Sequence, residues 1–209
     1  MEQPHIMIII PDSFPDSLVE KITSDIKSDT LKLKVNKVPN EPMMAVELTI
    51  PALIAIFIAQ SYFGGFLSEL GKDHYTVLKK WIKKTAIDSR KINVVTLAAS
   101  QSTKKIDKSN TQSKAFSLHL KTYDNKHIKL LFDLNLEDEI WEKAIDKMIN
   151  LIHENYKCYP NDELTKSIAE LNTHRQNIYA IINPKTEKWE YFDHMMLFKP
   201  QNELNKNER

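Results

Sequence analysis

The sequence predicts an α+β fold built on a mixed β-sheet, and three observations support this prediction. An apolar run near the N-terminus is followed by a helical pattern and an alternating strand, which gives a β-α-β start. A central uncharged segment precedes a lysine-rich pattern, which indicates an apolar helix followed by a basic amphipathic helix. A hairpin pattern in the second half then leads into a long amphipathic helix.

The first elements are a strand, a helix and a second strand. The run His5–Ile10 favours a strand that is buried on both faces. Ser13 followed by Asp16 predicts a capping box, and the helix after it has an apolar stripe. The stripe consists of Leu18, Val19, Ile22 and Ile26. Apolar residues then alternate with polar ones over 31–36, as in a half-exposed strand.

The segment Leu48–Ser68 carries no formal charge over twenty-one residues, in a chain in which 27% of residues are charged. Its length could cross a hydrocarbon layer of about 30 Å. Pro51, the pair Gln60-Ser61 and the pair Gly64-Gly65 interrupt it, however, and leave the eleven residues 50–60 as a helix of core size. We therefore expect a buried helix, with conditional docking on a membrane and a constitutive span as the two alternatives.

Residues 73–86 predict the basic amphipathic helix. Its apolar side contains Val77, Leu78, Trp81 and Ile82, and its basic side contains Lys79, Lys80, Lys83 and Lys84. Eleven basic residues against three acidic ones give the stretch 72–114 a net charge of +8. The lysine face could meet an anionic membrane surface, whereas nucleic acid is less favoured because no aromatic side chain on that face could stack on bases. A solvated face without a partner is the plainer interpretation.

The second half contains strands, helices and a polar link. We expect a strand at 92–98, a polar loop at 100–114, a helix capped by Asn135 with Asp138, a short helix at 162–171, and a hairpin of 178–182 with 188–192. A hairpin also joins the alternating strands 116–120 and 128–132. A three-residue loop at 124–126 would pair Leu120 with Leu130 and place both apolar sets on one face.

The domain prediction is one α+β domain over 1–198 with two lobes, about 1–99 and 115–198, joined by the polar loop 100–114. The tail 199–209 has little to bury and should be disordered. The N-terminus lacks the basic start and apolar run of a signal peptide, and the single cysteine, Cys158, cannot form an internal disulfide. We therefore expect a cytoplasmic protein, with peripheral membrane association as the alternative.

Several classes of site are excluded by composition. The chain has three glycines, where average usage of about 7% would predict about fifteen. Phosphate-binding loops and nucleophile elbows need glycine, and neither pattern occurs. No familiar metal motif is present either, so we expect no cofactor and no metal. The 29 basic and 28 acidic residues give a formal charge of +1, which indicates no global preference for nucleic acid.

The candidate ligand loop follows the first strand and contains Asp12, Ser13 and Asp16. Ligands often bind beyond the carboxyl ends of parallel strands, although helix caps and turns use the same residue types. A nuclease-like site that uses Asp12 or Asp16 is the catalytic version of this hypothesis.

The histidines and the cysteine do not form a predicted active site. His153 and Cys158 are five residues apart, which puts them on different sides of a continuing helix. In the hairpin register given above, His119 and His127 lie four pairing steps apart, too far to share a metal ion.

The run Tyr62-Phe63-Gly64-Gly65-Phe66-Leu67-Ser68-Glu69-Leu70-Gly71-Lys72-Asp73-His74-Tyr75, continuing into Leu78-Lys79-Lys80, resembles a segment of small uncharacterised bacterial proteins. The order of predicted elements over residues 5–98 is also similar to that of accessory components of bacterial conflict and defence systems. The resemblance implies a bacterial source and a defence-associated role, and it carries over no functional residue.

Three functional hypotheses follow from the sequence. The first is a non-catalytic binding or accessory module that acts through a protein partner. The second is a membrane-acting effector that uses the apolar helix 48–68 and the lysine face 79–84. The third is an enzyme of unfamiliar motif that uses Asp12 or Asp16.

Overall fold

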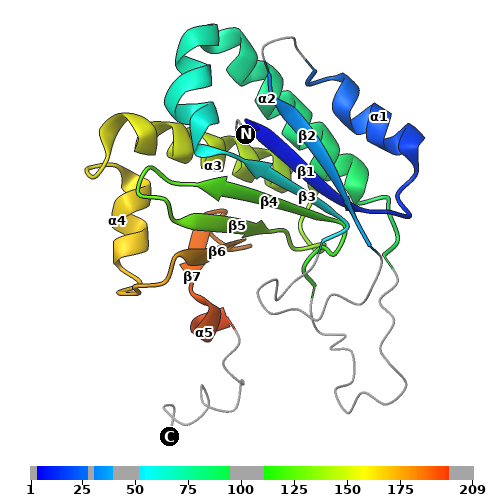
Figure 1. The fold of residues 1–209 in the computed structure, drawn as a ribbon. Helices are drawn as coiled ribbons and strands as arrows, with labels where there is room; N and C mark the ends of the chain where they lie inside the picture. The colour runs from blue at the N-terminus through cyan, green and yellow to red at the C-terminus, as the bar shows by residue number, and fades with distance from the viewer. Residues whose placement is uncertain (1–3, 28–30, 40–51, 95–110, 198–209) are drawn as a thin grey trace, which may run out of the picture.

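The computed structural model describes residues 4–27, 31–39, 52–94 and 111–197, with the side chains of 65–73 left out of the description (Figure 1). The elements in chain order are β1 (Ile6–Pro11), α1 (Asp16–Ser24), β2 (Leu33–Val38), β3 (Ile54–Ile58), the π-helical turn η1 (Tyr62–Phe66), α2 (Leu67–Ser89), β4 (Phe116–Lys121), β5 (His127–Leu131), α3 (Asp138–Cys158), α4 (Glu163–Ala169), β6 (Asn177–Ile182), β7 (Trp189–Phe192) and α5 (His194–Leu197).

One mixed sheet of seven strands organises the fold, in the order β2-β1-β3-β4-β5-β6-β7. The pairs β1–β2, β3–β4 and β5–β6 are parallel, and the chain reaches the second strand of each pair through helices. The remaining neighbours are antiparallel. The predicted α+β class and its β-α-β start are therefore confirmed.

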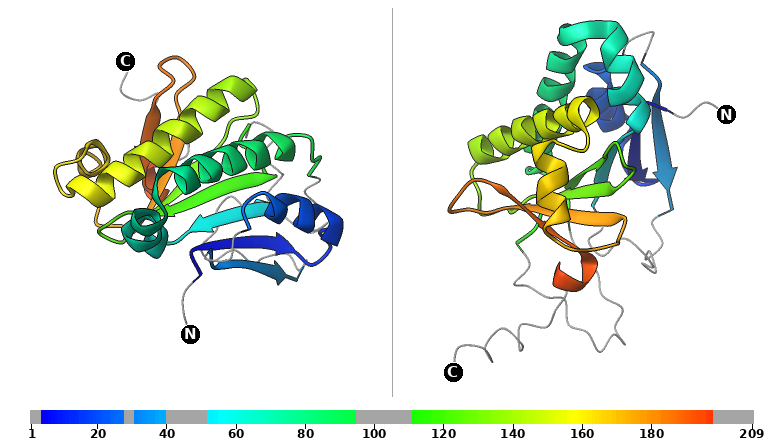
Figure 2. Two further views of the ribbon diagram at one scale, coloured as in Figure 1. Left: turned by 90° about the horizontal axis from the view of Figure 1, so that it is seen from above. Right: turned by 90° about the vertical axis from the view of Figure 1, so that its left-hand side faces the viewer.

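Helices α1, α2 and α3 lie side by side on one face of the sheet (Figures 1 and 2), which we call the helix face. Every second strand residue points into the core on this face, including Ile8, Ile56, Leu118 and Leu130. The stripe predicted for α3 is confirmed, because its apolar side chains are buried against the sheet. Burial of apolar area on this face is the main stabilising contribution, at about 25 cal/mol per Å².

The prediction of one apolar helix over 48–68 is wrong, because its described part forms β3, then η1 and the first residues of α2. β3 lies between β1 and β4, and Ile54, Ile56 and Ile58 are buried in the core. A central strand is apolar on both faces, so its run of residues lacks the alternation that normally distinguishes a strand from a buried helix. Its β-branched isoleucines favour the strand. In the part of the chain that the structure describes, no helix is long and apolar enough to cross a membrane.

The basic amphipathic helix is confirmed and is longer than predicted, because α2 follows directly from η1. Tyr62 and Phe63 are buried in η1, and Gly64 faces the ring of Tyr156, which lies 3.7 Å from the position that a Cβ would occupy. Trp81 and Ile82 are buried as expected, whereas Val77 is 41% exposed.

The first hairpin forms, but its predicted register is wrong by two residues. Leu130 pairs with Leu118 and not with Leu120. The connection closes over residues 122–126, where Thr122 N–H donates to the Lys126 carbonyl and Asn125 adopts a φ of 67°. Asparagine tolerates this left-handed conformation, which makes the longer loop favourable.

Other expectations have mixed outcomes. The second hairpin is confirmed as β6 and β7. The capping predictions are wrong, because α1 and α3 are preceded by Pro15 and Glu137, and neither residue makes a side-chain capping bond. Residues 92–94 are not a strand, and the rest of that predicted strand, the loop 100–110 and the tail 199–209 lie outside the described residues. The two predicted lobes contribute strands to the same sheet, since β3 pairs with β4.

The position of β3 predicts that Ile56→Ala lowers the free energy of unfolding by about 2–5 kcal/mol, because it removes core volume at the centre of the sheet. Urea unfolding followed by circular dichroism measures this change. Val77→Ala, at an exposed position of α2, is the control and should cost about 0.5 kcal/mol or less. An equally small effect at both positions would contradict the central placement of β3.

Candidate functional site

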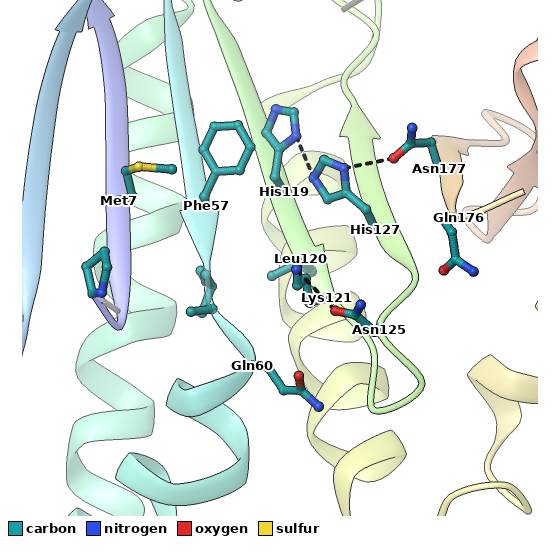
Figure 3. A pocket seen from close by; sticks show the side chains of 13 residues that line it. Met7, Phe57, Gln60, His119, Leu120, Lys121, Asn125, His127, Gln176 and Asn177 are labelled. Atoms are coloured by element: carbon teal, nitrogen blue, oxygen red, sulfur yellow. Dashed lines mark hydrogen bonds between the residues drawn. The ribbon is translucent and has the colours of Figure 1, made fainter. Parts of the chain in front are cut away.

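The second face of the sheet, opposite the helix face, carries a row of side chains from five neighbouring strands. Met7 of β1, Phe57 of β3, His119 of β4, His127 of β5 and Asn177 of β6 follow one another across the sheet (Figure 3). Met7 pairs with Phe57, Phe57 with His119, and His127 with Asn177. His119 and His127 are diagonal neighbours in the register of β4 and β5. We call these five residues the cross-strand row.

The rings of Phe57, His119 and His127 stack face to face along the row. The centroids of Phe57 and His119 are 4.0 Å apart with 18° between their planes, and those of His119 and His127 are 5.0 Å apart at 21°. Because the ring faces cover one another, the rings do not form an open stacking platform for nucleic-acid bases.

A chain of hydrogen bonds runs along the same row. Ser117 Oγ lies 2.9 Å from His119 Nε2, and His119 Nδ1 lies 3.1 Å from His127 Nε2. His127 Nδ1 lies 3.3 Å from Asn177 Oδ1. The amide oxygen can only accept, so His127 donates from Nδ1 and accepts at Nε2. His119 then donates from Nδ1 and accepts the Ser117 hydroxyl at Nε2, which satisfies all four groups with both imidazoles neutral.

Burial and nearby charge keep these imidazoles neutral. His119 is 1% exposed, and burial is the main cause that holds its pKa well below the usual value. The pKa of His127 is also lowered, first by burial and then by Lys121 and Lys129, and only partly restored by the bond to Asn177. Lys129 is 5% exposed, and burial lowers its pKa to about 8, so it is mostly protonated at neutral pH.

A cavity of about 820 Å³ lies over this row, a size within the range of about 300–1,000 Å³ typical of small-molecule sites. The described residues that line it are Pro4, Met7, Phe57, Ile58, Ala59, Gln60, His119, Leu120, Lys121, Asn125, His127, Gln176 and Asn177. It lies at the edge of the sheet where β3 and β4 end and β5 and β6 begin. One side is apolar, and the other carries amides, imidazoles and an ammonium group.

The groups of the cross-strand row can form hydrogen bonds, but they do not form a recognisable catalytic or metal site among the described residues. Ser117, His119 and His127 have the order of a nucleophile, a base and a group that orients the base. Ser117 is fully buried and does not line the cavity, so its hydroxyl has no approach to a substrate there. Two imidazoles are fewer than the three protein ligands of typical catalytic metal sites, and no cluster of three or more His, Cys, Asp or Glu suited to a metal occurs among the described residues.

The predicted loop Asp12, Ser13 and Asp16 lies at the other end of the sheet, beyond the carboxyl end of β1. All three residues are exposed, and Asp16 forms an ion pair with Lys37 of β2. They contribute nothing to the cavity over the cross-strand row.

The four predicted lysines of α2 do not share a common environment. Lys79 and Lys83 both pair with Asp146 of α3, at 3.4 Å and 2.8 Å. Lys84 pairs with Asp25 beside α1. Lys80 is exposed and forms no ion pair within the described part of the chain. Three of the four charges thus join helices together, which leaves a weaker basic surface than the sequence indicated.

The histidine pair could not be recognised from the predicted register, in which the two rings were too far apart. This expectation is wrong, because the two-residue shift in pairing brings the ring nitrogens within 3.1 Å. The signal in the sequence is the alternation of Ser117, His119 and Lys121 with buried apolar residues. Such a polar set on an inner strand indicates a second face with its own polar chemistry. Cys158 lies exposed at the end of α3, apart from this site.

Comparisons with protein-family models, with curated proteins and with solved structures find no match for this chain. The fold and the site define the class of this protein as a two-layer α+β protein with a cavity of mixed apolar and polar lining on its second sheet face. The protein partner and the defence-associated role stay predictions.

The lowered pKa values predict that stability falls in mild acid. Below pH 6.5 the unfolded chain protonates its histidines, whereas the fold keeps His119 and His127 neutral, so the free energy of unfolding decreases with falling pH. Each histidine contributes at most about 1.4 kcal/mol per pH unit until its folded pKa is reached. Urea unfolding at pH 7.5, 6.5 and 5.5 measures this slope.

His119→Gln should reduce the slope, whatever its effect on absolute stability. His174→Gln is the control, because His174 is exposed and is not part of the cross-strand row. A slope unchanged in His119→Gln would show that the fold does not hold this ring neutral.

Proposed function

We propose that the protein is a non-catalytic binding protein that takes a small molecule into the cavity over the cross-strand row. The observation that carries this proposal is a cavity of about 820 Å³ with an apolar wall on one side and convergent polar groups on the other. Such a combination is typical of small-molecule sites, in which apolar contact supplies affinity and a few polar groups fix orientation.

Binding is favoured over catalysis by the state of the reactive groups. Both nitrogens of His119 and of His127 already have hydrogen-bond partners inside the protein. A general base needs a nitrogen that reaches the proton it removes. The two neutral imidazoles therefore have a structural role, in which His119 stacks on Phe57 and His127 donates to Asn177.

Rigidity of the surroundings supports the same proposal. The lining residues come mainly from strands and from the short loops at their ends, and the loop residue Tyr123 is held by Gln60 and by Asn155 of α3. Asn155 in turn is fully buried and donates to Asp162 and Thr165. A site on rigid elements loses little entropy when a ligand binds.

The proposal predicts that a cavity-filling substitution abolishes ligand binding. Ala59 lines the cavity at the end of β3, so Ala59→Phe should place a ring in the ligand space. We expect a screen of small polar molecules, read by thermal shift and by ligand-observed NMR, to find compounds that stabilise the wild type. A compound present at 100 times its Kd should add about 2.7 kcal/mol.

Ala169→Phe is the matched control, because it makes the same change at an exposed alanine of α4. Compounds that bind the wild type should bind this control and fail to bind Ala59→Phe. Compounds that bind all three proteins equally, or a broad screen without any hit, would contradict the proposed function.

A further inference from the structure

We propose that the ligand is a small organic anion, whose negative group lies beside Lys121, Asn125 and Asn177 and whose apolar part lies against Met7 and Phe57. This inference rests on the proposed function, because it assigns a chemical class to the ligand of the same cavity. Figure 3 shows Met7 and Phe57 on β1 and β3, and Lys121, Asn125 and Asn177 on β4, on the loop after it and on β6.

The charge of the lining supports an anion. None of the described residues that line the cavity is Asp or Glu, although the chain has 28 acidic residues against 29 basic ones. Lys121 is in the lining, and Lys129 is buried on the same sheet face next to the two imidazoles. Burial is the main cause that lowers the pKa of His127, and the charges of Lys121 and Lys129 add to it in the same direction. A positive potential of this kind favours an anion and disfavours a cation.

The hydrogen-bond inventory supports an acceptor-rich ligand. Asn177 uses its amide oxygen to accept from His127, and Asn125 uses its oxygen to accept from Lys121 at 3.1 Å. Among the described residues no acceptor is bound to either NH₂ group, and Lys121 uses one of its three N–H donors, so these groups can donate to a ligand. Gln60 has the opposite arrangement, since it donates to the Tyr123 carbonyl and keeps its oxygen. Donors predominate beside Lys121, which suits a carboxylate or phosphate group.

The size and the apolar wall indicate an organic anion. Pro4, Met7, Phe57 and Ala59 offer no charged group, and the cavity is far larger than the ~30 Å³ share of one water molecule. Phe57 and Asn177 lie on strands three positions apart, a span of about 14 Å at roughly 4.8 Å per strand. A ligand that reaches both walls needs an apolar body as well as its anionic group.

The test uses a matched pair of probes, 2-naphthoate and 2-naphthamide, which share a ring system and differ in charge. Acetate provides the anionic group without the apolar body. Isothermal titration calorimetry at pH 7.5 and low salt should show 2-naphthoate binding at least about tenfold more tightly than 2-naphthamide, with acetate weaker than both, because charge-assisted hydrogen bonds are stronger than neutral ones.

Lys121→Gln tests the role of the ammonium group, and this side chain is exposed, so the variant should fold. We expect it to reduce the preference for 2-naphthoate about tenfold while the affinity for 2-naphthamide stays the same. Lys80→Gln is the control, because it removes an equal charge from α2 on the helix face. It should leave both affinities unchanged.

Three outcomes would overturn the inference. Equal or tighter binding of 2-naphthamide would reject an anionic ligand, while the proposed small-molecule site would stand. A preference that persists in Lys121→Gln, or that falls equally in Lys80→Gln, would reject the assigned position of the negative group. Failure of all three probes at millimolar concentration would reject this ligand class, and the broader screen with Ala59→Phe decides the proposed function separately.

Discussion

Strand β3 pairs with β1 on one side and with β4 on the other, and these two ladders join the first half of the chain to the second. Its isoleucines fill the centre of the core on the helix face, and Phe57 takes part in the cross-strand row on the second face. Removing β3 would separate β1 and β2 from the other strands and expose two rows of backbone groups. The core and the candidate site both depend on this placement.

The same constraint bears on the membrane hypothesis. A segment that leaves the fold to enter a bilayer would have to break both ladders of β3 and empty the centre of the core. Three of the four lysines that the membrane hypothesis assigns to lipid headgroups are paired with Asp146 or Asp25. These interactions favour a segment that stays in the sheet and a lysine face that holds helices together.

The second face of the sheet differs in chemistry from the helix face because α1, α2 and α3 do not cover it. Helices α1 to α3 cover the helix face, so the residues between the core positions form a surface with different chemistry. Near β6 and β7 this surface is apolar, where Leu197 of α5 packs with Leu131 and Tyr179. Farther along the sheet it is polar, with neutral imidazoles held between Ser117 and Asn177. The candidate ligand cavity lies over this polar part.

Local patterns in the sequence predicted the amphipathic helices and most strands, because period and turn chemistry are local properties. They did not predict β3, because the uncharged run 50–60 shows no alternation and its eleven residues are as long as a buried helix, whereas the shorter run of β1 favoured a strand. The pair His119 and His127 was missed for a different reason. A two-residue shift in register keeps every side chain on its face but changes the residue that it pairs with. The register depends on the loop between β4 and β5, in which Asn125 has a positive φ, and the alternation of the two strands does not show this conformation.

The central claim is that the register of β4 and β5 joins His119 and His127 in a directed hydrogen-bond chain that ends on Asn177. Long-range ¹⁵N NMR of the imidazole rings at pH 7.5 tests it most directly, because the spectrum reports which ring nitrogen carries the proton. The account predicts two neutral rings, each protonated at Nδ1. A proton on Nε2 of either ring, or a doubly protonated ring, would contradict it.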